Sequence, residues 1–235
     1  MSNSRSQSIF QRVEKKYMLT REQYVMLLEA LKEQGMEPDE FGVHAVCNVY
    51  YDTKDDLLIR RSIEKPVYKE KLRLRYYGTK GEEDIVFAEI KKKYKGVVYK
   101  RRITIDQEHA HRWFAVERHC PQSTQIGREL DYMMKRYELY PRVYIGYDRM
   151  ALFYPENPDL RVTFDTEIRW RTTDLDLRAG DWGHPLLEPE QYLMEIKIPG
   201  ALPLWLCRAM EELGIRQCSF SKYGTCYQKF LRSEK

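Results

Sequence analysis

Cations occupy alternate positions of one predicted strand, residues 67–77. Lys69, Lys71, Arg73 and Arg75 alternate there with other residue types, two of them leucines. Because successive strand residues point to opposite faces of a sheet, these four cations share one face. The planar guanidinium of arginine contacts phosphate oxygens in pairs and stays charged when water is removed. This strand could therefore bind a phosphate-rich ligand.

The same alternation recurs on five further predicted strands. The residues on those faces are Arg12, Glu14 and Lys16; Glu89, Lys91 and Lys93; Lys100 and Arg102; Arg161; and Glu195 and Lys197. On any one strand, such charges are also compatible with an ordinary solvated sheet face, where opposite charges help pairing. Repetition favours a ligand, because same-sign charges on neighbouring strands repel unless a polyanion neutralises them. If the sheet closes with this face inward, it forms a cationic tunnel.

Carboxylates on the same faces could serve as salt-bridge partners or as metal ligands. Mg²⁺ and Mn²⁺ in phosphoryl-transfer sites take one or two carboxylates and complete their shell with phosphate and water. We expect Glu195 to be the first metal ligand and Glu89 the second, with Mn²⁺ or Mg²⁺ as the cofactor. Phosphoryl transfer depends mainly on positioning and charge neutralisation, so the lack of an evident protein nucleophile does not argue against catalysis.

Residue periodicity predicts an α+β fold in which an antiparallel eight-stranded β-barrel tunnel carries peripheral packing helices. Thr20 and Gln23 form a capping-box pattern ahead of a helix that ends near Gly35. Four further helices are predicted at residues 107–118, 125–137, 202–213 and 221–231. Alternation predicts strands at residues 9–18, 45–51, 67–77, 85–94, 97–105, 142–150, 160–169 and 192–198. No linker or repeat divides the chain, so residues 1–235 are predicted to form a single domain.

Composition excludes several classes of protein. A net charge of +4 is too small for a protein that coats nucleic acid by charge alone, and no nucleic acid is expected as a partner. The five cysteines form no CxxC pair, which argues against structural zinc and favours reduced thiols in the cytoplasm. No membrane segment is expected, and no Walker A, GxGxxG or HExxH pattern occurs. Any bound phosphate must therefore be held by side chains.

An ordered series of short motifs resembles the triphosphate tunnel metalloenzymes, and more closely the polyphosphate polymerase domain of the vacuolar transporter chaperone (VTC) family. The motifs extend from Arg12 to about Tyr227 and are RVEKKY at 12–17, VYYDT at 49–53, LRLRYY at 72–77, FAEIK at 87–91, YDR at 147–149, RVTFDT at 161–166, MEIK at 194–197 and FSKY at 220–223. Each motif is weak alone, and their order makes the resemblance specific. The chain looks like a bacterial stand-alone form.

This resemblance implies an enzyme that transfers the γ-phosphate of ATP to a polyphosphate chain with Mn²⁺ or Mg²⁺. ATP and inorganic polyphosphate or pyrophosphate are the expected partners. The catalytic residues by motif are Lys16, Arg73, Arg75, Lys91, Arg149, Arg161 and Lys222. Tyr147 and Ser221 are implied as further phosphate contacts, and the strand faces add Arg12, Lys71, Lys93, Arg102 and Lys197. Glu195 is implied as the metal ligand.

Strand alternation gives an uncertain orientation for Arg149. It places Arg149 in phase with Val143, Ile145 and Tyr147, so a β-bulge would be needed to turn it towards the cations.

Three alternatives to polymerase activity are compatible with the sequence. Glu14 and Glu89 belong to the acidic lining of the wider superfamily, where several glutamates favour hydrolysis, so an inorganic or nucleoside triphosphatase fits the same motifs. A polyphosphate-binding module without turnover needs only the basic face. RNA binding through residues 91–95 is the third alternative, and it would depend on Lys92 and Lys95.

Overall fold

The computed structural model describes residues 12–78 and 85–232, and the side chains of residues 12 and 13 lie outside that description. The described residues form two compact units, each built from separate stretches of the chain. The smaller unit comprises residues up to Glu40, Met150–Phe164 and Glu190–Ser219. The larger unit comprises Phe41–Arg149, Asp165–Pro189 and the residues from Phe220 onward. The prediction of a single domain stays a prediction.

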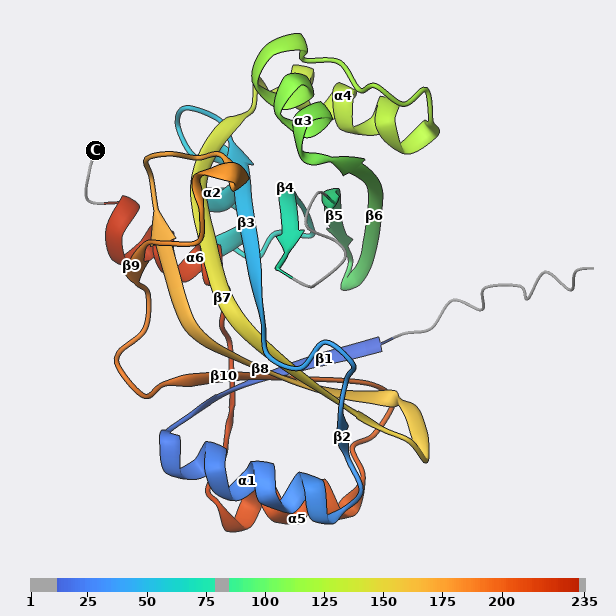
Figure 1. The fold of residues 1–235 in the computed structure, drawn as a ribbon, viewed down its shortest axis with the longest axis vertical. Coiled ribbons are helices and arrows are strands. Elements are labelled where there is room, and N and C mark those ends of the chain that lie inside the picture. The colour runs from blue at the N-terminus through green and yellow to red at the C-terminus, as the bar shows by residue number, and fades with distance from the viewer. Residues whose placement is uncertain (1–11, 79–84, 233–235) are drawn as a thin grey trace, which may run out of the picture. The chain divides into compact units, whose positions relative to one another are not determined.

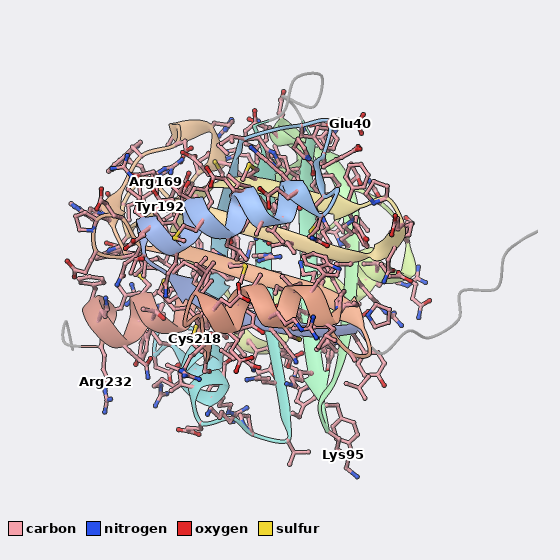
Figure 2. All side chains as sticks on the ribbon, turned by 90° about the horizontal axis from the view of Figure 1, so that it is seen from below. Glu40, Lys95, Arg169, Tyr192, Cys218 and Arg232 are labelled. Atoms are coloured by element: carbon pink, nitrogen blue, oxygen red, sulfur yellow. The ribbon has the colours of Figure 1, made fainter. Side chains whose placement is uncertain are left out.

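The smaller unit is an antiparallel set of strands with two helices. Its elements are β1 (Arg12–Leu19), α1 (Arg21–Glu33), β2 (Glu37–Pro38), β10 (Tyr192–Pro199), α5 (Leu204–Glu212) and β11 (Gln217–Cys218), with residues 150–154 of β7 (Tyr140–Tyr154) and 157–164 of β8 (Asn157–Arg171). The strand order is β11-β1-β10-β8-β7, and β2 pairs with β7. Helices α1 and α5 lie side by side (Figures 1 and 2). Their apolar residues pack on Leu19, Phe164 and Ile196.

Local sequence explains helix α1. The Thr20 hydroxyl accepts a hydrogen bond from the Gln23 backbone N–H at 3.2 Å, and the Gln23 side chain accepts one from the Thr20 N–H at 3.0 Å. This reciprocal pair is the predicted capping box, and it satisfies backbone donors that the first helical turn leaves unpaired. Gly35 follows the helix at a φ of 82°, a conformation that glycine adopts without strain. The predicted start and end of this helix are confirmed.

The larger unit combines a strand series with the remaining helices. Its elements are β3 (His44–Asp52), α2 (Leu57–Ile63), β4 (Tyr68–Tyr77), β5 (Ile85–Tyr94), β6 (Val97–Asp106), α3 (Gln107–His111), η1 (Arg112–Glu117), α4 (Gln125–Tyr137), η2 (Leu177–Ala179), β9 (His184–Pro185), α6 (Lys222–Cys226) and η3 (Tyr227–Leu231), with the remaining parts of β7 and β8 (Figure 1). The strand order is β7-β3-β4-β5-β6, and β9 pairs with β8. The pairings of β3 with β4 and β7, of β4 with β5, of β5 with β6 and of β8 with β9 are antiparallel.

One face of the β3–β6 strands forms the core of the larger unit. Leu72, Leu74 and Ile90 are buried there among apolar side chains that include Trp113 of η1 and Leu130 of α4. The Trp113 indole N–H also donates to the Asp131 carboxylate at 2.8 Å, which satisfies the one polar group of this buried ring. Alternate residues of the same strands must therefore point to the opposite face.

The predicted α+β class and its antiparallel sheet are confirmed. The eight predicted strands correspond to the eight long strands, and three strands of two residues, β2, β9 and β11, bring the number to eleven. Strand pairing within the described residues ends at β11 and at β6, so hydrogen bonds between strands do not close the sheet. Closure into a barrel stays a prediction. None of the described helices is long and apolar enough to span a membrane. The five cysteines form no disulfide.

Helix α2 was not predicted from the sequence, because its capping group lies on another element. The Asp52 carboxylate, at the end of β3, accepts hydrogen bonds from the backbone N–H groups of Leu58 and Ile59 at 2.8 and 2.9 Å. It also accepts from the backbone N–H of Thr53 at 2.8 Å and from the Tyr223 hydroxyl at 3.0 Å. Asp52 is fully buried, and four donors satisfy it. The carboxylate therefore joins β3, α2 and α6.

Replacing Asp52 with alanine should destabilise the larger unit strongly. D52A leaves buried donors without an acceptor, and the expected loss in the free energy of unfolding is about 3 kcal/mol. Urea unfolding measures the loss directly. D55A removes a neighbouring exposed carboxylate and should cost less than about 1 kcal/mol. A loss of less than about 1 kcal/mol for D52A would show that this carboxylate does not hold the three elements together.

Candidate phosphate-binding site

Strand register brings the predicted cations of the larger unit onto the face opposite the core. Arg73 on β4 pairs with Tyr50 on β3 and with Glu89 on β5. Arg75 pairs with Asn48 on β3 and with Phe87 on β5. Directly paired residues share one face of an antiparallel sheet, so these side chains lie together. We call this the basic face of the larger unit.

The first arginine of the basic face has a carboxylate partner. Arg73 contacts Glu89 at 2.8 Å through Nε and 2.7 Å through Nη2. Lys100 Nζ lies 2.6 Å from the other Glu89 oxygen, which lacks a hydrogen bond of normal angular geometry, so this second contact is ionic. Burial alone would raise the pKa of the Glu89 carboxyl. The positive charges of Arg73, Arg75 and Lys100 outweigh burial and lower this pKa to about 2. Glu89 is therefore a fully charged counter-ion held between two cations.

The second arginine has only neutral partners. Arg75 is 6% exposed, and its guanidinium donates to Asn48 Oδ1 at 2.8 Å, the Tyr77 hydroxyl at 3.0 Å and the Tyr147 hydroxyl at 3.3 Å. Within residues 12–78 and 85–232, no carboxylate lies within salt-bridge distance of Arg75. A buried charge without an opposite charge is costly and stabilises a bound anion. Arg75 is the clearest sign of an anion site.

A second group of cations surrounds one buried aspartate. Arg149 contacts the two oxygens of Asp165 at 2.6 and 2.8 Å, and Lys222 contacts the same carboxylate at 2.5 Å. Both cations also lie over the Tyr147 ring, at 5.1 Å for Arg149 and 4.3 Å for Lys222. The Tyr147 hydroxyl accepts from Arg75, so this group adjoins the first. Two cations therefore share the carboxylate of Asp165.

The orientation of Arg149 needs no β-bulge. Arg149 and Tyr147 pair with His44 and Val46 on β3, four and two residues before Asn48. Tyr147 itself points to the basic face, where its hydroxyl contacts Arg75. Arg149 is in phase with Tyr147 and therefore points to the same face. The irregularity in the pairing of β3 with β7 lies elsewhere, between Tyr50 and Tyr51.

The remaining predicted cations of the larger unit extend this face. Lys71 Nζ lies 3.3 Å from the Ser221 hydroxyl, and Lys71 pairs with Lys91 in the strand register. Lys91 and Lys93 are exposed. The exposed Arg102 guanidinium lies over the Phe87 ring at 4.5 Å. Lys92, on the other side of the strand, forms an ion pair with Glu129 of α4, which gives it a structural role.

The smaller unit holds the other predicted residues. Lys16 on β1 pairs with Glu195 on β10, and its ammonium lies 3.2 Å from Glu195 and 3.3 Å from Glu14. Glu14 is the strand partner of Lys197. The Glu195 side chain is 7% exposed, and the Glu14 side chain is 33% exposed. Two carboxylates thus share one ammonium.

Two further predicted cations of the smaller unit lie outside this trio. Arg161 is half-exposed and pairs with Asp39 at 2.9 Å. Arg12 pairs with Pro199 in the β1–β10 register, and its side chain lies outside the described residues.

The donor set fits a divalent ion at Glu195 better than at Glu89. Glu195 and Glu14 both contact the Lys16 ammonium, so two carboxylates lie close together there, whereas Glu89 is a single carboxylate held by Arg73 and Lys100. In the part of the chain that the structure describes, no three His, Cys, Asp or Glu side chains cluster as a complete metal shell. An ion there would complete its shell with phosphate oxygens and water, as Mg²⁺ and Mn²⁺ do in phosphoryl-transfer sites.

Residue alternation alone did not identify several contributors to the basic face. Asn48, Tyr50 and Tyr77 hydrogen-bond to the two arginines. Asp165 holds two cations, and it lies in a buried stretch of β8 beside Phe164. The signal was present in the phase of the strands, since Asn48 and Tyr50 lie across from Arg75 and Arg73, and Tyr77 follows Arg75 on the same face of β4. Tyrosine in a strand is more often a core residue, which hides that signal.

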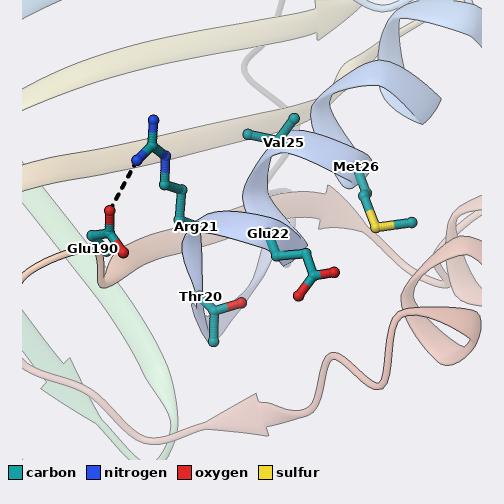
Figure 3. A pocket seen from close by; sticks show the side chains of 6 residues that line it. All are labelled: Thr20, Arg21, Glu22, Val25, Met26 and Glu190. Carbon is teal, nitrogen blue, oxygen red and sulfur yellow. Dashed lines mark hydrogen bonds and ion pairs between the residues drawn. The ribbon is translucent and has the colours of Figure 1, made fainter.

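A shallow depression on the smaller unit does not belong to this arrangement. It is lined by Thr20, Arg21, Glu22, Val25, Met26 and Glu190 at the start of α1 (Figure 3). Arg21 and Glu190 pair across it at 3.0 Å, and both are well exposed. Its charges are mixed and its walls are partly apolar, so it does not fit a polyanion.

Comparison with known proteins adds a family and a fold. The family model of the VTC domain matches residues 11–231. No match was found among curated proteins. A candidate adenylate cyclase from Bacillus halodurans matches with a TM-score of 0.57 and 16% identity, covering 93% of this chain and 96% of that chain. A candidate adenylyl cyclase from Hippeastrum, described as having a dominant triphosphatase activity, matches with a TM-score of 0.54 and 16% identity over 95% and 96% of the two chains. At such identities the likeness shows the fold alone.

Replacing Arg75 should separate binding from stability. R75M removes a buried charge that has no carboxylate partner, so the free energy of unfolding should change by less than about 2 kcal/mol in either direction. The affinity for inorganic tripolyphosphate should fall by about 10- to 100-fold, because charge-assisted hydrogen bonds to the anion are lost. Calorimetric titration and urea unfolding measure the two effects.

The control R101M removes an arginine that pairs with Glu129, and it should leave tripolyphosphate affinity unchanged. If R75M binds tripolyphosphate as tightly as wild type, Arg75 is not part of an anion site. A loss of stability above about 3 kcal/mol would instead make Arg75 a structural residue.

Glu89 should give the protein an acid-sensitive stability. Because the pKa of Glu89 is about 2 in the folded chain and about 4.5 in an unfolded one, its charged form stabilises the fold above about pH 4.5. That contribution, about 3 kcal/mol at most, is lost as the pH falls through about 2. Urea unfolding from neutral to acidic pH should show the loss in wild type and a flatter profile in E89Q. The control E108Q removes an exposed glutamate of the same unit and should keep the wild-type slope in this range; equal slopes for E89Q and wild type would contradict the assignment.

Proposed function

The chain belongs to the VTC domain family, and from that membership we propose that it is a metal-dependent polyphosphate polymerase. It would transfer the γ-phosphate of ATP to a growing chain of inorganic polyphosphate. The observation that carries this proposal is the basic face of the larger unit, where Arg75 is buried with neutral partners only. A phosphate chain supplies the missing negative charge at many successive positions, whereas a single phosphate supplies it at one.

The reaction needs no nucleophile from the protein. A terminal oxygen of the polyphosphate chain forms a bond to the γ-phosphorus of ATP, the bond from that phosphorus to the β–γ bridging oxygen breaks, and ADP leaves with the electron pair. Catalysis then consists of aligning the two phosphate chains and neutralising their charges. Arg73 and Arg75 can do both, since a guanidinium binds two oxygens at fixed geometry.

Each predicted residue has a defined part in this proposal. Arg149 and Lys222 would bind phosphate oxygens from their shared position on Asp165. Lys71, placed beside the Ser221 hydroxyl, would supply a further cation and a neutral donor. In the smaller unit Lys16 would contact phosphate. Arg161, Lys91, Lys93, Arg102, Arg12 and Lys197 are proposed as outer cations that attract the polyanion by charge.

Glu195 is the proposed metal ligand, with Glu14 as a second carboxylate. A Mn²⁺ or Mg²⁺ ion held there would polarise phosphate oxygens and neutralise charge on the transferred group. The two carboxylates lie within 3.3 Å of the same Lys16 ammonium, which keeps them close to each other.

Triphosphatase activity is the second candidate, and the acidic pair favours it. Glu14 and Glu195 could position a water molecule in place of a polyphosphate oxygen, and the product would then be orthophosphate. The Hippeastrum protein of similar fold is described with such an activity. The two reactions share the attacked phosphorus and differ in the attacking oxygen.

Incubation with ATP and Mn²⁺ distinguishes these reactions. We expect wild-type protein to produce ADP and long polyphosphate, which gel electrophoresis resolves by length. E195Q should reduce turnover by about 100-fold or more, because charge stabilisation in the transition state is lost, and should leave tripolyphosphate affinity within about threefold of wild type. E190Q is the matched control, since it changes an exposed glutamate of the same unit.

The products decide between the candidates. Orthophosphate from ATP or tripolyphosphate without polymer would replace the polymerase with a triphosphatase. Tight tripolyphosphate binding without any turnover would make the domain a polyphosphate-binding module. Equal turnover in E195Q and wild type would remove Glu195 from the metal site.

A further inference from the structure

Tyr50 lies at the centre of the basic face and contacts its first arginine. Arg73 Nη1 donates a hydrogen bond to the Tyr50 hydroxyl oxygen at 3.1 Å, and the Arg73 guanidinium carbon lies 5.8 Å from the Tyr50 ring centre. On its other side the ring packs on Tyr223 of α6, with 5.1 Å between ring centres. The side chain is buried, at 7% exposure. Packing thus fixes the position of Tyr50, and its hydroxyl oxygen orients Arg73.

The charged groups that face Tyr50 are mainly positive. Strand β4 contributes Lys71, Arg73 and Arg75. Strand β5 contributes Glu89, but this carboxylate is already in contact with Arg73 and Lys100.

The groups on α6 and β3 add no free negative charge near the Tyr50 oxygen. The Tyr223 hydroxyl donates to Asp52, and Lys222 contacts Asp165. Across the described ranges, 12–78 and 85–232, no carboxylate is hydrogen-bonded to the Tyr50 hydroxyl. The Tyr50 oxygen therefore lies in a positive electrostatic potential that Glu89 offsets only in part.

This field favours the ionised form of the phenol. Burial by itself raises the pKa of Tyr50, but the charges of Arg73, Arg75 and Lys71 outweigh it and lower the pKa to about 8. The neighbouring Tyr77 shows the same direction, since Arg75 overcomes the effect of burial there and lowers its pKa. Tyr51, the next residue on β3, points to the core, where burial raises its pKa. The effect thus belongs to the basic face.

We propose that Tyr50 is a positioning residue whose protonation is coupled to phosphate binding: its oxygen orients Arg73, and a bound phosphate chain causes it to take up a proton. The inference rests on the proposed phosphate-binding role of Arg73 and Arg75. Above about pH 8 and without a ligand, Tyr50 is a tyrosinate whose oxygen supplies negative charge to the cations. When a polyanion arrives, it neutralises the same cations and repels the tyrosinate, and one proton moves from solvent to the oxygen.

The protonated residue keeps its positioning role. Its oxygen still accepts from Arg73 through a lone pair, and its hydrogen becomes available to a phosphate oxygen. The negative charge of Tyr50 is thus exchanged for that of the ligand, and Arg73 stays oriented in both states. Positioning of this kind lowers the cost of organising the site at the moment of binding.

The sign of the pH effect follows from this exchange. Below about pH 8 the hydroxyl is already protonated, so binding requires no proton and affinity does not depend on Tyr50 ionisation. Above that pH binding requires the uptake of one proton, and affinity should fall by up to about tenfold per pH unit. The fall ends where Tyr50 also ionises in the complex.

Calorimetric titration with inorganic tripolyphosphate at about pH 7 and about pH 9, in two buffers of different ionisation enthalpy, measures affinity and proton uptake together. Wild type should take up more protons at the higher pH than Y50F does. Proton uptake or release by tripolyphosphate itself is the same for both proteins, so it cancels when the two are compared. Y50F should bind about fivefold more weakly at the lower pH, because Arg73 loses its oriented acceptor. The control Y51F changes the adjacent buried tyrosine on the core face and should match wild type in both measurements.

The outcomes separate this inference from the proposed function. If wild type and Y50F bind tripolyphosphate with the same proton uptake at both pH values, the coupling is wrong although the phosphate site stands. If wild type does not bind tripolyphosphate, the proposed function itself fails.

A second measurement does not need the variant to fold. The near-ultraviolet absorbance of tyrosinate in wild type should show one tyrosine ionising near pH 8, and tripolyphosphate should move that ionisation to higher pH. A titration curve that is unchanged by the ligand would overturn the inference.

Discussion

Two arginines placed two residues apart on one strand set the main constraint on this structure. Arg73 and Arg75 point to the same face of β4, and their charges lie mostly out of water. Like charges at this spacing repel, and their desolvation is costly unless acceptors surround them. Strands β3, β5 and β7 each supply such an acceptor, in Tyr50 and Asn48, Glu89, and Tyr147. These residues supply the acceptors that one buried and one partly buried cation need.

The positive charges of Arg73 and Arg75 are only partly compensated. This arrangement favours anion binding more than it stabilises the free protein. Glu89 balances Arg73, while Arg75 receives hydrogen bonds without negative charge. A second glutamate across from Arg75 would stabilise the free protein and would also compete with an incoming phosphate. The neutral amide and hydroxyl groups orient Arg75 and leave its charge for a ligand. The same balance recurs where Arg149 and Lys222 share the single carboxylate of Asp165.

The sequence was sufficient for features whose causes are local. The capping box at Thr20 fixed the start of α1, and alternation of Arg and Leu fixed the two faces of β4. Helix α2 could not be predicted, because the carboxylate that satisfies its first N–H groups comes from the end of β3. The same reason applies to Tyr50: nothing beside it in sequence shows that register places it across from Arg73.

Several parts of the candidate site depend on pairings that sequence patterns do not contain. Alternation identified Lys16, Glu195 and the cations of β4 and β5, because each is polar on an alternating strand. It did not show that Glu89 is held by two cations or that Lys222 contacts Asp165. Strand register determines the contacts of Glu89, and the packing of α6 determines the contact of Lys222 with Asp165. Because Glu89 is held by two cations, Glu195 is the better candidate for a metal ligand.

Electron density from crystals soaked with inorganic tripolyphosphate and Mn²⁺ tests the central claim most directly. The account predicts phosphate oxygens within hydrogen-bonding distance of the Arg73 and Arg75 guanidinium groups, with the anomalous signal of manganese at the Glu195 carboxylate. Density for the anion at another surface, with the basic face of the larger unit empty at saturating ligand, would contradict it.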